Sequence, residues 1–212
     1  MTDPAPLADE PFEPELRSSE IEFTGRVWDV RRDAFAYGDE TLVRDYVDHT
    51  GAVAIVAMDE LERVHLVQQY RHPVRARQWE VPAGLLDVPG EDPLLAAQRE
   101  LAEEADLAAA SWHVLADFST SPGGSDEQVR IYLARGLSAV APFDREGEEA
   151  DMLHRWVPLD ECVDAVLARR VHNPSLCVGV LAAHVSRERG WSTLGPADAP
   201  WPERSRPRQR DS

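Results

Sequence analysis

The stretch GLLDVPGEDPLLAAQRELAEEADL, residues 84–107, decides the fold expected for this chain. A helix is expected to begin after Asp92, because Asp is a favoured N-cap and Pro93 stands at the first helical position, where its missing N–H costs nothing. The apolar residues that follow are spaced by three and four, which places them on one face: Leu94, Ala97, Leu101 and Ala105. The stretch therefore predicts an amphipathic helix that packs against a core.

A second face of this helix carries three carboxylates, because Glu100, Glu103 and Glu104 stand at positions i, i+3 and i+4. Like charges at this spacing destabilise a helix by roughly 0.2–0.5 kcal/mol per pair, an effect that a bound cation would reverse. Hard oxygen ligands suit Mg²⁺ or Mn²⁺. The alternative is a solvated acidic face, which is the ordinary explanation in a chain of net charge −17. The carboxylates alone leave both possibilities open.

The surrounding positions closely resemble the Nudix box, a loop–helix–loop whose glutamates bind divalent metal around a diphosphate. Gly84 is followed after six residues by Glu91, and the segment 99–107 then reads RELAEEADL. Two positions depart from the family pattern, which has five residues in that first interval and Gly where this chain has Asp106. Both lie in the flanking loops, and Asp tolerates left-handed geometry. The resemblance implies structural roles for Gly84 and for an internal ion pair between Glu91 and Arg99.

The same resemblance implies the ligands of the metal. Glu100 and Glu104 would be the principal ligands, with Glu103 assisting directly or through water, and the backbone carbonyl of Ala83 would be a further ligand. The expected cofactor is Mg²⁺, with Mn²⁺ as a possible substitute. The resemblance also implies a fold class, the α/β Nudix sandwich of α/β/α layers with a mixed sheet, together with a small N-terminal antiparallel β segment.

The remaining sequence fits such a fold. We expect a mobile lead-in at 1–19, an N-terminal β dimerisation segment at 20–50, the Nudix domain at 51–191 and a disordered, Pro- and Arg-rich tail at 192–212. Strands are expected at 21–24, 27–31, 41–48, 51–58, 63–70, 78–81, 112–119, 129–134 and 154–158. Two further helices are expected at about 160–169 and 174–188, the second starting with Asn173-Pro174 and stopping at Gly190.

Charge and composition exclude several classes of function. A net charge of −17 argues against binding nucleic acid or an anionic membrane surface. No apolar run approaches the eighteen residues of a transmembrane helix, and the N-terminus lacks the pattern of a signal peptide. Cys162 and Cys177 lack metal-binding spacing and indicate buried thiols in a reducing compartment. We therefore expect a cytoplasmic protein.

Three features resemble the ADP-ribose pyrophosphatase branch of the family. The sequence Gln69-Tyr70-Arg71, followed by the run WEVPAG at 79–84, looks like that branch's entry into the box. Pro122 stands fifteen residues beyond Leu107, close to the proline that marks ADP-ribose hydrolases. Residues 20–48 resemble the small β-domain through which these enzymes dimerise. The resemblance implies a homodimer that splits ADP-ribose into AMP and ribose 5-phosphate.

The expected substrate contacts come from several segments. Arg71 and Arg44 are candidates for the phosphates, since a guanidinium pairs with phosphate in a fork, although each can equally be a surface salt bridge. Trp28 could stack on adenine across a dimer interface, or could be a core or interface residue. Glu80 could accept a hydrogen bond from the base or ribose, or could brace Arg71. Ser125 is a further candidate contact, with loop turn chemistry as its alternative.

The catalytic base is expected on a loop after the box, where Glu146, Glu148 and Glu149 crowd together. Glu149 aligns best with the base of related enzymes, and Glu148 is the second candidate. The alternative is that these residues only form a solvated acidic loop without a catalytic role. Two other functions remain open. One is a pyrophosphatase for another nucleoside diphosphate sugar, such as GDP-mannose. The other is a non-catalytic Nudix module that binds ADP-ribose, against which the intact glutamates speak.

Overall fold

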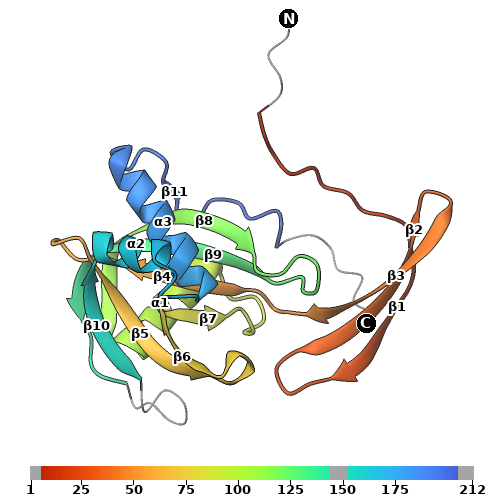
Figure 1. Cartoon of the computed structure of the whole chain (residues 1–212), viewed down its shortest axis with the longest axis horizontal. Coiled ribbons are helices and arrows are strands. Elements are labelled where there is room, and N and C mark those ends of the chain that lie inside the picture. Colours follow the sequence, from red (N-terminus) through yellow and green to blue (C-terminus); the bar gives the residue numbers. More distant parts are fainter. Residues whose placement is uncertain (1–5, 144–151, 205–212) are drawn as a thin grey trace, which may run out of the picture. The chain divides into compact units, whose positions relative to one another are not determined.

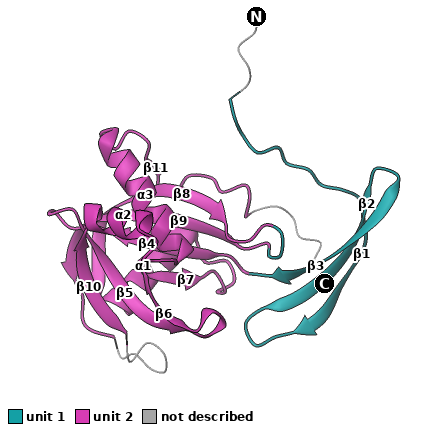
Figure 2. Cartoon of the chain, in the orientation of Figure 1, with its two compact units in different colours: residues 1–49, 123–125 teal, residues 50–122, 126–212 magenta. Residues whose placement is uncertain are grey.

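The computed structural model describes residues 6–143 and 152–204, which divide into two compact units. The first unit contains the chain up to His49 together with Gly123–Ser125, and the second contains residues 50–122 and 126 onward (Figure 2). Strands β1 to β7 precede helix α1, strands β8 to β10 follow it, and helices α2 and α3 come before the short strand β11 (Figure 1). Among the described residues, none of the helices has both the length and the apolar character needed to cross a membrane.

The first unit is a three-stranded antiparallel sheet of order β1-β2-β3, formed by β1 (Leu16–Thr24), β2 (Asp29–Tyr37) and β3 (Glu40–Asp48). Gly38 has a φ of +58° in the turn between β2 and β3, where the pair Gly38-Asp39 predicts a turn. The strands are longer than expected, and β1 begins inside the expected lead-in. The reason is pairing, because β2 extends to Tyr37 and gives Leu16 a partner in Phe35.

The second unit contains two sheets. The larger has the order β11-β8-β9-β4-β7, and its strands are β4 (Ala52–Ala57), β7 (Ala83–Leu85), β8 (Leu107–Ser119), β9 (Gln128–Ala139) and β11 (Gly195–Pro196). The smaller has the order β10-β5-β6, with β5 (Arg63–Arg71), β6 (Ala76–Glu80) and β10 (Leu153–Pro158), and the short helix η1 (His72–Val74) joins β5 to β6. In the larger sheet β4 and β9 are parallel while β8 and β9 are antiparallel, so the sheet is mixed as predicted.

Strand β4 is buried on both faces and separates two cores. Val53 and Ile55 face a core shared with helix α1 (Pro93–Ala105), whereas Ala54 and Val56 face a core shared with α2 (Leu159–Leu167) and α3 (Pro174–Glu188). Helices therefore cover both faces of the larger sheet, and the expected α/β/α sandwich is confirmed. We call the core beside α1 the α1 core.

The helix ends follow their capping residues. The side chain of Asp92 accepts a hydrogen bond from the Leu94 N–H at 2.8 Å, and that of Asn173 accepts one from the Leu176 N–H at 3.0 Å. Helix α1 stops at Ala105 because Asp106 is left-handed, with a φ of 54° and a ψ of 37°. The sequence pattern located these ends to within a residue or two.

The C-terminal segment differs from the expected disordered tail at 192–212. Strand β11 pairs with β8, and the side chain of Trp201 is only 6% exposed within the α1 core. The expectation rested on a low aliphatic content, and one buried aromatic ring with a few backbone hydrogen bonds outweighs that composition. Residues 205–212 lie outside the described part of the chain.

Candidate active site

Glu104 connects the last turn of α1 to the loop that enters β7. Its carboxylate accepts a hydrogen bond from the backbone N–H of Ala83 at 3.0 Å, and the residue is 6% exposed. A carboxylate is nearly buried here because the adjacent backbone N–H supplies a charge-assisted partner. The contact brings together two residues, Glu104 and Ala83, that the sequence predicts as metal ligands.

Gly84 lies against Glu100, the second predicted principal ligand. A Cβ atom built on Gly84 would stand 1.9 Å from Cδ and 2.1 Å from Oε1 of Glu100, whereas real Cβ atoms keep at least about 3 Å. The absence of a side chain at Gly84 therefore leaves the space that the Glu100 carboxylate occupies. This gives a physical reason for the glycine at the start of the box.

Arg99 gathers three carboxylates around one guanidinium. Its Nε and Nη2 donate to both oxygens of Glu91 at 3.1 and 3.0 Å, so the predicted ion pair is present. Its Nη1 also donates to Glu100 at 2.6 Å and to Glu103 at 3.1 Å. The hydrogen bonds to Glu91, with further ones to Glu100, raise the pKa of Arg99 and hold the pKa of Glu91 below its ordinary value. Arg99 thus offsets the repulsion between the box carboxylates.

The predicted metal ligands are carboxylate and carbonyl oxygens, which are the atoms that a hard divalent cation prefers. Their side chains are arranged around partners of the protein itself: Glu100 and Glu103 contact Arg99, and Glu104 contacts the Ala83 N–H. Accordingly, within residues 6–143 and 152–204, no three acidic, His or Cys side chains converge as a ready-made metal site. Binding of a cation by Glu100 or Glu103 would compete with the hydrogen bonds that these two carboxylates accept from Arg99.

Arg71, at the end of β5, is held by Glu80 at the end of β6. Nε and Nη2 of Arg71 donate to the two oxygens of Glu80 at 2.9 and 2.7 Å. The Glu80 side chain is 2% exposed, while that of Arg71 is 42% exposed. Of the two roles expected for Glu80, the structure shows the brace for Arg71. A bidentate pair of this kind fixes the plane of the guanidinium.

Three other expected contacts belong to the first unit. Trp28 is 45% exposed, and its ring stacks on His49 with centroids 5.3 Å apart. Arg44 donates to the carbonyl of its neighbour Val43 at 2.8 Å. The hydroxyl of Ser125 donates to the Val47 carbonyl at 3.5 Å. Glu148 and Glu149, the expected bases, lie outside the described residues.

Two of these arrangements were not anticipated from the sequence. Val47 at the end of β3 donates its N–H to the Gly124 carbonyl at 2.9 Å, so the segment Gly123–Ser125 is held to the other residues of the first unit. His49, which is 4% exposed, supports one face of the Trp28 ring. A lone histidine after a strand carries no pattern that would have revealed this contact.

Comparison with known proteins gives one family and several relatives. Residues 48–176 match the model of the NUDIX domain. The chain is 46% identical over 191 residues to an ADP-ribose pyrophosphatase of Mycobacterium tuberculosis (strain ATCC 25618 / H37Rv), covering 90% of this chain and 92% of the relative. It is also 35% identical to a methanol dehydrogenase activator of Bacillus methanolicus, covering 80% of this chain and 91% of that protein.

A solved structure has the same fold. The crystal structure of an ADP compounds hydrolase superposes with a TM-score of 0.67, covering 86% of this chain and 99% of the other. The sequence identity is 20%, so this likeness concerns the fold alone.

Proposed function

The chain belongs to the Nudix family, and from that premise we propose that it hydrolyses the diphosphate of ADP-ribose to AMP and ribose 5-phosphate. The observation that carries the proposal is the box itself, in which Glu104 is anchored to Ala83 and Glu100 fills the space beside Gly84. The mycobacterial relative named an ADP-ribose pyrophosphatase supports the choice of substrate, since the two chains align over nearly their whole lengths.

The box residues would hold a divalent cation, for which we propose Mg²⁺ with Mn²⁺ as a substitute. Glu100 and Glu104 would be the principal ligands, and Glu103 and the Ala83 carbonyl would assist. A bound cation supplies charge neutralisation at the phosphate oxygens and polarises phosphorus toward attack by water. Arg99 holds Glu100 and Glu103 by hydrogen bonds before the cation arrives.

Arg71 is the proposed phosphate contact of the second unit. Glu80 occupies Nε and Nη2 from one side of the guanidinium, and the 42% exposure of the side chain leaves room for an anion. The charge of a diphosphate is unfavourable in a protein of net charge −17, so a fixed local cation is needed to bind it. In the first unit, Arg44 is the proposed phosphate contact.

The attacking water must lose a proton as its oxygen bonds to phosphorus and the bridging P–O bond breaks. We assign the proton acceptor to Glu149, with Glu148 as the alternative, on the basis of their place in the loop after the box. Replacing each residue by Gln distinguishes the two. Only the replacement of the residue that accepts the proton should lower turnover strongly while the affinity for Mg²⁺ stays unchanged.

The nucleoside end is assigned to Trp28, whose ring is partly exposed and supported from one side by His49. A base could stack on the face that His49 leaves open. The hydroxyl of Ser125 donates its proton to the Val47 carbonyl, so a contact with substrate would have to be accepted by the hydroxyl oxygen or made by the backbone.

The first test is AMP release from ADP-ribose at millimolar Mg²⁺, beside Glu104→Gln and with GDP-mannose as the competing substrate. Glutamine keeps an oxygen that can accept from the Ala83 N–H, so the variant should fold while turnover falls at least about 10–100-fold. Turnover on GDP-mannose alone would keep the chemistry and replace the substrate. Binding of ADP-ribose without turnover would identify a non-catalytic module.

We also propose a homodimer that forms through the N-terminal sheet. Large apolar side chains are exposed on its strands and on the turn between β1 and β2, including Phe23 at 63%, Val27 at 59% and Tyr37 at 57%. Phe23→Asp should shift the protein to the monomer in size-exclusion chromatography with light scattering. Leu61→Asp is the matched control, because Leu61 is 72% exposed in the second unit. A dimer that survives Phe23→Asp and deletion of residues 1–48 would refute the proposal.

For location we propose the cytoplasm. Cys162 and Cys177 are both free thiols, which fits a reducing compartment.

A further inference from the structure

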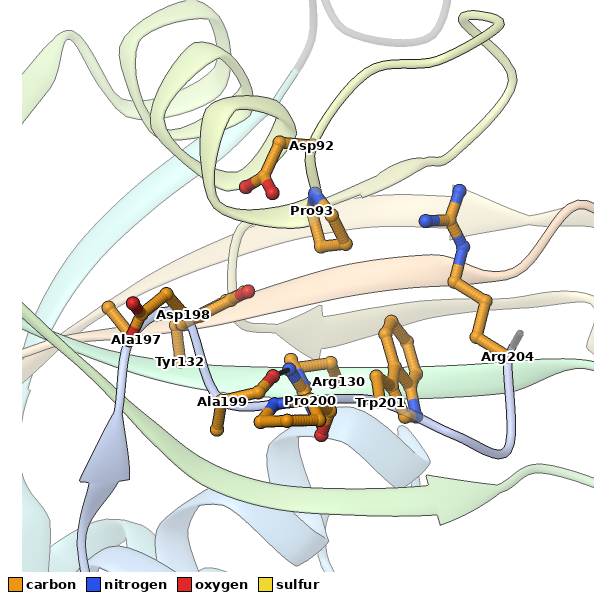
Figure 3. Close-up of a pocket in the computed structure, with 10 residues that line it drawn as sticks. All are labelled: Asp92, Pro93, Arg130, Tyr132, Ala197, Asp198, Ala199, Pro200, Trp201 and Arg204. Carbon is orange, nitrogen blue, oxygen red and sulfur yellow. Dashed lines mark hydrogen bonds between the residues drawn. The ribbon is translucent and has the colours of Figure 1, made fainter.

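The segment that follows α3 is attached to the larger sheet at two places. Gly195 and Pro196 pair with Val114 and His113 of β8. Six residues beyond Gly195 the side chain of Trp201 is buried in the α1 core. We call residues 195–204 the strap. In Figure 3 the strap lies on one side of a pocket and the start of α1, at Asp92 and Pro93, lies on the other.

Arg130 of β9 fastens the strap to the sheet. Its Nη1 donates to the Ala199 carbonyl at 2.6 Å, and its Nη2 donates to the Pro200 carbonyl at 3.1 Å. The guanidinium also pairs with both oxygens of Asp117 at 2.8 Å and lies 4.7 Å from the ring centroid of Trp201. Arg130 is 3% exposed, so a charge this deeply buried depends on all these partners together.

Trp201 belongs to the same core as the apolar face of α1. That core also contains four residues of the helix: Ala96, Ala97, Leu101 and Ala105. All four have small or medium side chains on the face next to the carboxylates. Trp201 carries the largest side chain of this core, whose other large members include Ile55 and Tyr132.

The pocket between the strap and the helix start has a volume of about 240 Å³ and is lined by Tyr132, Trp201 and Pro93 among others. The first turn of α1 therefore has space beside it that no side chain fills. Without the indole ring this space would widen, and the helix could shift into it. A shift of about 1 Å at catalytic groups can cost on the order of 100-fold in rate.

We infer that the strap sets the position of helix α1, which makes Trp201 a positioning residue for the glutamates of the box. The ring lies on the core side of the helix, and the glutamates lie on the adjacent face, so the ring acts on them through the helix backbone. This inference rests on the proposed function in one respect, because it takes the glutamates of α1 to be the metal ligands.

Three variants test it: Trp201→Ala removes the ring, Trp201→Leu keeps an apolar side chain, and Trp201→Phe keeps an aromatic one. The control is Leu176→Ala, because Leu176 is 1% exposed in the core on the opposite face of the larger sheet. The first readout is hydrogen exchange of the α1 amides in metal-free protein. The second is the dissociation constant of Mn²⁺, measured by electron paramagnetic resonance, together with kcat and KM for ADP-ribose.

Trp201→Ala should speed exchange in α1 and weaken Mn²⁺ about 10-fold. It should lower kcat more than it raises KM, since the proposed substrate contacts lie outside α1. Trp201→Leu should do the same to a smaller extent, and Trp201→Phe should restore most of the affinity. Leu176→Ala should lower stability without weakening Mn²⁺.

Unchanged α1 exchange and Mn²⁺ affinity in both Trp201→Ala and Trp201→Leu would overturn the inference, as would equal weakening of Mn²⁺ by Leu176→Ala. Failure of the proposed function gives a different result: the wild-type protein would not cleave ADP-ribose, or Glu104→Gln would bind Mn²⁺ as tightly as wild type. The exchange measurement on α1 tests the strap in either case.

Discussion

Gly84→Ala places a methyl group where the carboxylate of Glu100 lies, at 1.9 Å from Cδ and 2.3 Å from Cγ. The backbone of Gly84 is not left-handed, so the whole effect is steric. The obstructing atoms belong to one side chain, which can swing away only by losing its 2.6 Å hydrogen bond with Arg99. Overpacking of this kind costs about 1–3 kcal/mol, and we expect a loss of stability in that range.

A double-mutant cycle with Glu100→Ala isolates this contact. Glu100→Ala removes the three atoms that the new methyl group would meet, so Gly84→Ala should cost almost nothing in that background. The assay is urea unfolding of the four proteins without metal, followed by tryptophan fluorescence. Gly123→Ala is the control, because a Cβ there meets nothing within 4 Å. An equal cost of Gly84→Ala with and without Glu100 would refute the reasoning.

Three further predictions concern charge. Arg99→Met should lower the melting temperature in metal-free buffer, because the box carboxylates then repel one another. Millimolar Mg²⁺ should raise the melting temperature of this variant more than that of wild type, and an equal rise in both proteins would contradict the prediction. Arg71→Met leaves the nearly buried Glu80 carboxylate without its bidentate partner and should cost about 1–3 kcal/mol in urea unfolding, part of which Glu80→Met should recover in the double variant. Burial raises the pKa of the Cys162 thiol from 9.0 to about 12, so its stabilising contribution is complete below pH 9 and is lost as the pH rises toward 12. Urea unfolding between pH 8 and 11 should show that decline, and a decline as steep in Cys162→Ala would count against the assignment.

Some expectations failed because they relied on composition. The tail at 192–212 looked disordered for want of aliphatic residues, yet Trp201 is buried and Arg130 holds the backbone beside it. Strands β8 and β9 are longer than their apolar patterns because they pair with each other along their whole lengths. The first pair is Leu107 with Ala139 and the last is Ser119 with Gln128. Backbone pairing extends a strand wherever a partner is present, whatever the local residues are.

The sequence by itself determined the features that depend on neighbours a few positions apart. Asp92 and Asn173 mark the helix starts because a cap needs only the next turn, and the spacing within α1 places the glutamates beside its apolar face. The tertiary structure alone decided the contacts between distant segments. Arg130 and Ala199 are 69 positions apart, and Ser125 and Val47 are 78 apart. Such pairs depend on how the strands align in the folded chain, and no local periodicity encodes that alignment.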